Sequence, residues 1–249
     1  MVFPDASTAL SPAALAWSLI TRLGEAQILL PALLVACVVL AWCGGARQAW
    51  IWLAAVATAT LLTTASKVAF IGFGWGWPGL DFTGVSGHAM FAAAIWPPLL
   101  WLCARPLPPR WRAAGWLAGT ALALLVGVSR LVVHAHSLSE VVAGALLGGA
   151  VSALLLRATL QPSPPRVSPL ALLPQRMQAQ HALTRGLPLA LLMWVLLGVT
   201  AAAPSRSHDW VTRLALVSSG RSAPFLRGQW LQAVPALRSG LPSASLQAR

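Results

Sequence analysis

Residues 26–42 read AQILLPALLVACVVLAW, an apolar run without a single charged side chain. A helix needs about 20 predominantly apolar residues to cross the hydrocarbon core of a bilayer. This run approaches that length, and it therefore predicts a transmembrane helix. The turn Gly44-Gly45 follows it directly, and a second apolar run begins a few residues later.

The composition of the whole chain agrees with this segment. Of its 249 residues, 57% are hydrophobic and only 9% are charged, and the mean hydropathy is +0.73. Ordinary globular chains carry about 25% charged residues, and a water-facing surface cannot be covered with so few. The composition excludes a cytosolic enzyme, a disordered tail protein and a disulfide-built secreted module. It predicts an integral membrane protein.

Five further apolar runs predict additional spans. Short turns and loops separate most of them, and a Pro- and Ser-rich stretch precedes the last one. The predicted fold class is therefore all-α, a polytopic membrane protein built as a six-transmembrane-helix bundle. The five runs cover approximately residues 49–65, 88–103, 113–128, 138–156 and 187–203.

Three stretches lie outside the predicted spans. Residues 1–25 predict an N-terminal interfacial segment with a short helix on the membrane surface, and they lack the basic region of a cleavable signal peptide. Residues 161–186 are rich in Pro and Ser and predict a cytoplasmic linker. Residues 204–249 carry apolar residues at helical spacing with arginines between them, which predicts an amphipathic C-terminal tail.

The charge distribution predicts an orientation in the membrane. The net charge is +12, and the arginines are spread through loops and the tail without a dense basic stripe. They indicate membrane topology and anionic head groups rather than nucleic acid. The arginine-rich loops are predicted to be cytoplasmic, so the opposite loops face the outer side of a bacterial inner (plasma) membrane. The tail and its six arginines also fall on that outer side, but tails weigh less in this rule. The predicted cytoplasmic arginines are Arg47, Arg105, Arg110, Arg112, Arg157, Arg166, Arg176 and Arg185.

The three cysteines predict neither a disulfide framework nor a zinc site. Cys37 and Cys43 lie in one apolar run and Cys103 lies in another, and no CxxC pair is present. Small packing residues inside helices are the favoured interpretation.

A small set of ionisable residues gathers at the outer ends of the predicted spans. Such residues at membrane depth are costly and usually functional. Cations can hold the non-bridging oxygens of a phosphate, one histidine can attack phosphorus, and another can protonate the leaving oxygen. The set therefore suits phosphate chemistry. Its members are Lys67, Asp81, His88, Arg130, His134, His136 and Glu140.

The first cluster is Ser86-Gly87-His88, at the start of the third predicted span. Ser86 stands where a helix N-cap would be, and free N–H groups at a helix start bind anions. Gly87 would let a phosphate approach the backbone closely. Taken alone, the tripeptide indicates only a capped helix with an interfacial histidine.

The second cluster runs from Ser129-Arg130 to His136 and Glu140. The last two residues are four apart, so they share one face if a helix starts near His136. A carboxylate there can fix the tautomer of the imidazole and stabilise the imidazolium. Ser137 to Glu140 also reads as a capping box, S-x-x-E, which would merely start the helix.

Together, the two clusters and Lys67 resemble the type-2 phosphatidic acid phosphatase family, a membrane lipid phosphatase superfamily related to vanadium haloperoxidases. The pattern of that family is Lys-x6-Arg-Pro, then Pro-Ser-Gly-His, then Ser-Arg-x5-His-x3-Asp. The resemblance covers about residues 26–160, which it identifies as the catalytic membrane core, and the six-span layout matches.

The resemblance implies a role for each matching position. His136 would be the nucleophile that forms a phosphohistidine, oriented by Glu140, and His88 would be the general acid that later helps to activate water. No metal or other cofactor is implied. The implied partners are a lipid phosphate substrate and membrane lipids. The phosphoryl oxygens would be held by Lys67, Arg130, Ser86 and Gly87.

The sequence departs from the family pattern at three positions. Gly74-Trp75 stands where the family has Arg-Pro, so one phosphate-binding arginine is missing. Val85 replaces the proline before Ser86, and Glu140 replaces the usual aspartate. The missing arginine implies weaker charge clamping, or an arginine supplied from elsewhere in the chain.

Two further features of the outer loops have no catalytic assignment. The insert Trp75-Gly76-Trp77 predicts mainly an interfacial aromatic anchor, with a contact to a lipid chain or head group as the sharper alternative. His134 is interpreted as a loop or polar-packing histidine, with a proton-shuttle role as the alternative, and Asp81 has no predicted role.

The predicted function is hydrolysis of a lipid phosphate or pyrophosphate. Undecaprenyl pyrophosphate, phosphatidic acid and phosphatidylglycerol phosphate are all compatible substrates. One alternative is a phosphotransferase, in which a lipid or sugar hydroxyl replaces water at the phosphohistidine. The missing arginine leaves a second alternative, a degenerate family member that binds lipid or a partner protein without catalysis.

Overall fold

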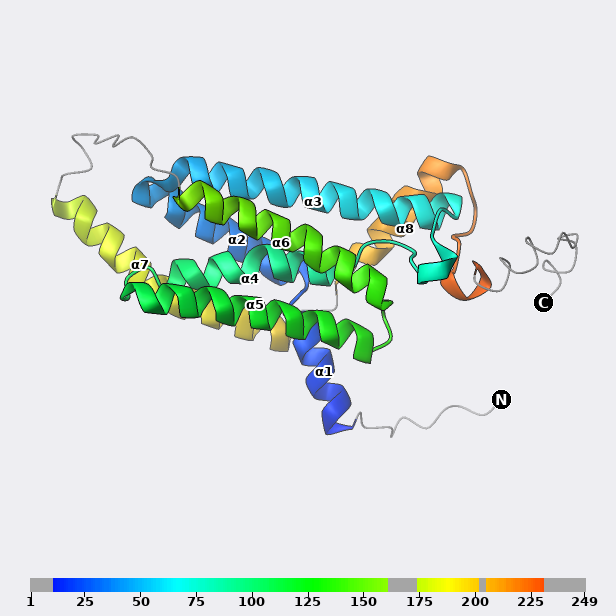
Figure 1. The fold of residues 1–249 in the computed structure, drawn as a ribbon, viewed down its shortest axis with the longest axis horizontal. Helices are drawn as coiled ribbons and strands as arrows, with labels where there is room; N and C mark the ends of the chain where they lie inside the picture. Colours follow the sequence, from blue (N-terminus) through cyan, green and yellow to red (C-terminus); the bar gives the residue numbers. More distant parts are fainter. Residues whose placement is uncertain (1–10, 161–173, 202–204, 231–249) are drawn as a thin grey trace, which may run out of the picture.

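The computed structural model describes residues 11–160, 174–201 and 205–230. Over these residues the chain is helical and holds no strand, apart from one isolated antiparallel bridge between Trp77 and Phe82. The predicted all-α fold class is confirmed (Figure 1). The elements are α1 (Pro12–Arg22), α2 (Ala26–Leu40), η1 (Ala41–Gly45), α3 (Ala46–Phe73), η2 (Pro78–Leu80), α4 (Gly87–Cys103), α5 (Pro109–Val132), α6 (Leu138–Leu160), α7 (Pro174–Ala201) and α8 (Ser207–Ser219).

α2 and α3 form a hairpin around η1, where the sequence predicts a turn. Cys43 leaves the helical conformation, and Gly44 adopts a φ of 88°. Glycine reaches this left-handed region without steric cost because it has no Cβ. The chain therefore reverses within a few residues and runs back alongside α2 (Figure 1).

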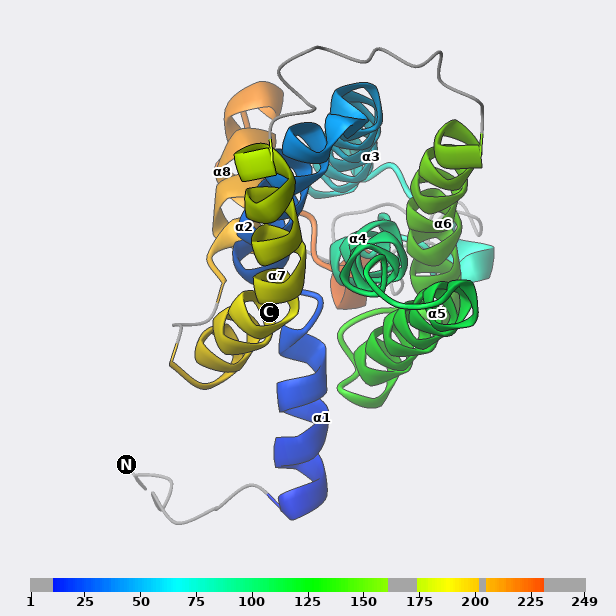
Figure 2. The same cartoon turned by 90° about the vertical axis from the view of Figure 1, so that its left-hand side faces the viewer.

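α4 is the central helix of the bundle. Figure 2 shows it end-on, with α2, α3, α5 and α6 around it. Its side chains are small or apolar over most of its circumference, and Met90, Ala92 and Ile95 are completely buried. A helix that is hydrophobic on all sides belongs in the interior of a bundle. The two helices that pack most closely on it, α5 and α6, hold Arg130 near the end of one and Glu140 near the start of the other.

Two consecutive prolines inside α4 are compensated by its neighbours. Pro97 and Pro98 have no N–H, so the carbonyl groups of Ala93 and Ala94 lose their helical donors. A buried carbonyl needs another partner. The Ser152 hydroxyl of α6 donates to the Ala93 oxygen at 2.6 Å, and Trp52 Nε1 of α3 donates to the Ala94 oxygen at 3.0 Å. The prolines thus fix α4 to both neighbouring helices.

Pairs of glycines allow α5 and α6 to approach the α4 backbone. A Cβ on Gly148 of α6 would lie 2.2 Å from the Met90 oxygen, and one on Gly144 would lie 2.5 Å from the Ser86 oxygen. Gly119 of α5 faces the Trp96 oxygen at 2.5 Å in the same way. Small residues four apart are typical of tightly packed helices in membranes.

Three helical stretches are long and apolar enough to cross a membrane by length and composition. They are residues 26–73, which contain the α2–α3 hairpin, and the helices α5 and α6. α4 and residues 186–201 form shorter apolar helices. The finding supports membrane association, and the count of six spans stays a prediction.

Several predicted boundaries shift in the structure. α7 begins at Pro174, so residues 174–186 are helical where the sequence predicts the second half of the linker. Pro is compatible with the first turn of a helix, because the N–H groups there have no intrahelical partner. The first half of the linker lies outside the described residues. The predicted helices at both ends of the chain are present as α1 and α8, whereas residues 1–10, 202–204 and 231–249 lie outside the described part.

Substitution of Gly148 by Ala should destabilise the bundle, because the added methyl group would collide with the Met90 carbonyl oxygen of α4. Overpacking of this kind costs about 1–3 kcal/mol. Gly149 offers a matched control, because a Cβ there meets no atom within 4 Å. Gly149→Ala should be neutral or stabilising, since Ala favours a helix by roughly 0.5–1 kcal/mol over Gly. Thermal unfolding of the two detergent-solubilised variants checks this, and equal melting temperatures would contradict the close packing of α4 and α6.

Candidate functional site

The predicted site residues meet at one end of the bundle, where α3 and α5 end and α4 and α6 begin (right-hand end of Figure 1). A cavity of about 810 Å³ lies there. Ser86 is the one predicted residue that does not line it, and its side chain is completely buried. The predicted residues that line the cavity are Lys67, Gly87, His88, Arg130, His136 and Glu140.

His136 and Glu140 form the predicted pair. The His136 Nδ1 atom lies 2.7 Å from the Glu140 Oε2 atom, and α6 starts between them at Leu138. A carboxylate at Nδ1 favours the tautomer that carries its proton there. The Nε2 atom then keeps its lone pair for attack on an electrophile.

The capping box is present at the same place. The Ser137 N–H donates to Glu140 Oε2 at 3.2 Å, and the Glu140 N–H donates to the Ser137 hydroxyl at 3.5 Å. The two interpretations of this motif are therefore compatible. One carboxylate both starts α6 and contacts the histidine.

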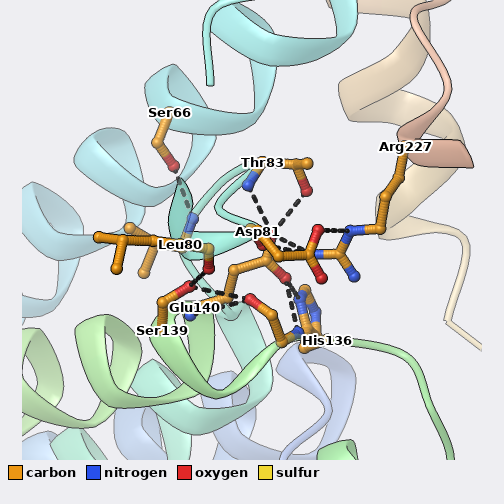
Figure 3. A network of polar contacts seen from close by, with 10 residues as sticks. Ser66, Leu80, Asp81, Thr83, His136, Ser139, Glu140 and Arg227 are labelled. Carbon is orange, nitrogen blue, oxygen red and sulfur yellow. Dashed lines mark hydrogen bonds and ion pairs between the residues drawn. The ribbon is translucent and has the colours of Figure 1, made fainter. Parts of the chain in front are cut away.

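Glu140 accepts further hydrogen bonds from segments distant in the sequence (Figure 3). Its Oε1 atom receives the Thr83 N–H at 2.7 Å, the Thr83 hydroxyl at 2.5 Å, and Arg227 Nη2 at 2.5 Å. The carboxylate is 1% exposed. A buried charge of this kind requires such partners.

The surroundings of His136 keep it neutral. Burial lowers the pKa of His136 below its usual value, and Lys67 and Arg130 lower it further. The hydrogen bond and the charge of Glu140 act in the opposite direction without restoring that value. The lowered pKa favours the neutral imidazole, which has the unprotonated ring nitrogen that a nucleophile requires.

The start of α4 faces the ammonium group of Lys67. A Cβ on Gly87 would lie 4.0 Å from Lys67 Nζ, so glycine leaves the space between them open. The free N–H groups at a helix start and a nearby cation both favour an anion. Ser86 is the N-cap residue of α4, as predicted, but its side chain makes no capping hydrogen bond. Its N–H instead donates to the Glu140 carbonyl oxygen at 3.1 Å.

Arg130 reaches the cavity from the last turn of α5. Its Nε atom is buried and has no hydrogen-bond partner within the described residues. Beside it, Ser129 is completely buried, accepts or donates a 2.7 Å hydrogen bond with the Thr21 hydroxyl, and anchors the end of α5 to α1. The cavity therefore contains a guanidinium whose Nε donor is not used within the described residues.

Sequence reasoning missed three residues of the site. Thr83 and Arg227 both contact Glu140, and Glu25 lines the cavity at the start of α2. Burial raises the pKa of Glu25, and Arg22 lies 3.6 Å from its carboxylate. An isolated acid beside the first apolar run is a signal that could have identified Glu25. The other two residues carry no local signal.

Two residues without a predicted role also lie at the site. His134 lines the cavity and has a φ of 53°, in the left-handed region. Asp81 has a φ of 47° and forms an ion pair with Arg227, with 3.3 Å between Oδ1 and Nε. Among the described residues, no group of three or more His, Cys, Asp and Glu side chains could hold a metal ion.

The chain resembles known proteins over the part that holds most of this site. Residues 48–162 match the PAP2 superfamily. A Klebsiella pneumoniae protein described as "Uncharacterized 22.5 kDa protein in cps region" is 45% identical over 141 residues, which cover 56% of this chain and 68% of that protein. No solved structure matches. Arg227 and Glu25 lie outside the residues matched to the superfamily.

Substitution of Glu140 by Gln should destabilise the protein. Gln preserves the capping box, but its amide group would face the Thr83 donors or Arg227 without a charge to offer them. Loss of a buried charged acceptor costs about 1–3 kcal/mol. Asp209 in the first turn of α8 is an exposed carboxylate and provides the control, because Asp209→Asn should change stability by at most about 1 kcal/mol. Thermal unfolding measures both, and a neutral Glu140→Gln would mean that the carboxylate acts only as a helix cap.

Proposed function

Because the chain belongs to the PAP2 superfamily, we propose that it is a membrane-embedded phosphatase that hydrolyses a lipid phosphate or pyrophosphate monoester through a phosphohistidine intermediate. The observation that carries the proposal is the His136–Glu140 pair in one cavity with His88, Lys67 and Arg130. This set supplies a nucleophile, a second proton-transfer group and two cations.

In the first step, His136 Nε2 attacks the phosphorus atom, and the bond from phosphorus to the leaving oxygen breaks. His88 donates a proton to that oxygen, so the leaving group departs as an alcohol or a phosphate. Glu140 stabilises the positive charge that forms on the imidazole ring of His136, which it contacts at Nδ1. The product of this step is a phosphohistidine.

In the second step, water attacks the phosphohistidine. His88 accepts a proton from the water, and the bond from phosphorus to nitrogen breaks to release inorganic phosphate and free His136. Lys67, Arg130 and the N–H groups at the start of α4 hold the non-bridging oxygens in both steps. Charge stabilisation by these groups makes a metal ion unnecessary.

The surroundings of the cavity favour a lipid substrate. Apolar side chains such as Leu30 and Phe91 line it together with the polar groups, and apolar helices form its walls. An acyl or prenyl chain can therefore remain among the helices while the phosphate reaches His136. Undecaprenyl pyrophosphate, phosphatidic acid and phosphatidylglycerol phosphate all meet this requirement. We place the cavity on the outer side of a bacterial inner membrane, following the arginine distribution.

His136→Ala should abolish phosphate release from lipid phosphates, because the nucleophile is lost, and His88→Ala should slow it by about 10²- to 10⁴-fold. His134 provides a matched control in the same loop. His134→Asn should keep most of the activity, because Asn tolerates its left-handed backbone. A phosphate-release assay with purified protein over the three lipid classes measures these effects.

The same assay in EDTA should give an unchanged rate, and a phosphate group on His136 should be detectable by mass spectrometry. Wild-type release by folded His136→Ala would contradict the proposal. Activity lost in EDTA and restored by magnesium would contradict the metal-free mechanism. A phosphorylated lipid or sugar hydroxyl in place of free phosphate would identify a phosphotransferase, and no turnover of any lipid would favour a binding protein.

Glu140→Asp should keep much of the activity, whereas Glu140→Gln should lose most of it. Asp retains the negative charge that stabilises the imidazolium, and Gln does not. Removal of such a preorganised contact costs about 2–4 kcal/mol in the transition state, which corresponds to about 30- to 1000-fold in kcat/KM. Steady-state kinetics of both variants check the order, and near-wild-type kcat/KM in Glu140→Gln would contradict a catalytic role for the carboxylate.

A further inference from the structure

We propose that Arg227 is the third cation of the phosphate site and donates to a non-bridging phosphoryl oxygen. Arg227 belongs to the C-terminal segment, residues 220–230, which follows α8. The inference rests on the function proposed above. Arg227 lines the cavity together with Lys67 and Arg130. It lies outside residues 48–162, to which the superfamily match extends.

Two carboxylates hold the Arg227 guanidinium in place (Figure 3). Its Nη2 atom contacts Glu140 Oε1 at 2.5 Å and the Asp81 carbonyl oxygen at 3.1 Å. Its Nε atom lies 3.3 Å from Asp81 Oδ1. Within the described residues, its Nη1 atom makes no hydrogen bond or ion pair. Because a guanidinium carries five donors in a rigid plane, it can be fixed through one edge and still donate to a ligand from the other.

Packing against α3 and the loop that follows it delivers this arginine to the cavity. The Phe225 N–H donates to the Ile71 carbonyl oxygen at 2.9 Å. Trp230 contacts Phe70 edge to face, with 5.3 Å between the ring centroids. Phe70, Ile71 and Ala215 of α8 form a buried apolar cluster against which Phe225 and Trp230 pack. Arg227 is therefore anchored by apolar contacts on both sides of its position in the chain.

Three alternating glycines make the docking surface for this segment. A Cβ on Gly72 would lie 2.8 Å from the Ala215 oxygen of α8. A Cβ on Gly74 would lie 3.2 Å from the Phe225 ring, and one on Gly76 would lie 2.9 Å from the Trp230 ring. These glycines thus leave room for α8, for Phe225 and for Trp230, and Gly76 lies in addition against the Phe82 carbonyl oxygen of its own loop.

Gly74 connects this docking surface with the missing arginine of the sequence pattern. A long side chain at position 74 would occupy the space of Phe225, and the φ of 71° there disfavours any residue with a Cβ. An arginine at position 74 is therefore disfavoured while the C-terminal segment is docked. In this chain the docked segment carries an arginine into the cavity.

The charges of the site suit this role. Glu140 and Asp81 offset part of the positive charge of Lys67, Arg130 and Arg227, and these five groups keep a net positive charge. That net charge attracts an anionic phosphoryl group. Arg is well suited to phosphate because its planar donors match the spacing of two oxygens.

The experiment compares Arg227→Ala, Arg227→Gln and Arg227→Lys with Arg213→Ala in the purified full chain. Arg213 is a matched control, because it is an exposed arginine of α8 that stacks on Trp210 and does not line the cavity. The measurements are kcat/KM for a lipid phosphate, the inhibition constant of inorganic phosphate, and equilibrium binding of inorganic phosphate. The Arg227→Gln variant removes the charge but retains a side-chain amide that can donate to Asp81. It therefore replaces the Ala variant in the comparison if the Ala variant does not fold.

The Ala and Gln variants should weaken phosphate binding by about 10- to 100-fold, which is the effect of losing a charged hydrogen bond. Lys should restore part of the loss, and Arg213→Ala should bind phosphate like the wild type. A residue that merely holds Glu140 would lower kcat and leave the phosphate inhibition constant unchanged. That result in folded Ala or Gln variants overturns the inference and leaves the phosphatase function intact.

Failure of the proposed function gives a different result. A wild-type protein that releases no phosphate from any lipid contradicts the phosphatase proposal. The phosphate-binding measurement still tests the role of Arg227 in that case. Equal phosphate affinity of the wild type and the Arg227→Gln variant overturns the inference, and a weaker affinity of the variant supports it.

Discussion

The buried carboxylate of Glu140 is the contact on which the arrangement of this site depends. Removing a carboxylate from water costs several kcal/mol, and the cost is offset only if other groups donate to it with good geometry. Here the donors come from three separate parts of the chain: Thr83 in the loop before α4, the His136–Ser137 turn, and Arg227 in the C-terminal segment. The carboxylate thus connects three segments that are distant in the sequence. It contacts both the histidine and the arginine, while apolar packing on α3 also holds the segment that carries the arginine.

The scaffold beneath the site is rigid because the helices contact one another through their backbones. Glycines of α5 and α6 lie against carbonyl groups of α4, and the side chains of Trp52 and Ser152 bind the carbonyl groups that the two prolines release. Such contacts leave little freedom for α4 to slide or rotate. His88, in the first turn of α4, and Glu140, in the first turn of α6, therefore keep their relative positions. The proposed reaction, which uses both His88 and His136, would depend on such fixed relative positions.

Local patterns allowed most of the fold and the centre of the site to be predicted. Apolar runs gave the helices, and the four-residue spacing of His136 and Glu140 predicted a contact that the structure confirms at 2.7 Å. The start of α7 at Pro174 was missed, because a Pro- and Ser-rich composition favours a linker and the first turn of a helix also accepts Pro. Arg227 was not found, because a contact between residues so far apart in the sequence leaves no periodicity or spacing to read.

The glycines at positions 72, 74 and 76 are a second feature that the sequence alone could not explain. Their sequence context, with tryptophans at 75 and 77, predicts an interfacial anchor, and these two side chains are indeed exposed, at 72% and 65%. The glycines lie against α8 and the segment after it, Gly76 also lies against the Phe82 carbonyl oxygen, and Gly74 has a left-handed φ of 71°. The role of a glycine can be assigned only once its spatial neighbours are known, because glycine is used both in tight turns and where another segment approaches the backbone closely.

The contact of Arg227 places the segment that follows α8 relative to the cavity. Arg227 contacts Glu140 directly, so the C-terminal segment and the phosphate cavity lie at the same end of the bundle, whichever face of the membrane that is. The arginine bias of short loops acts on the orientation of spans, and tails beyond the last span contribute less to it. An arginine that contacts a buried carboxylate has a local reason for its position. The contact with Glu140 therefore accounts for the position of Arg227, and the arginine bias of cytoplasmic loops is not needed to explain it.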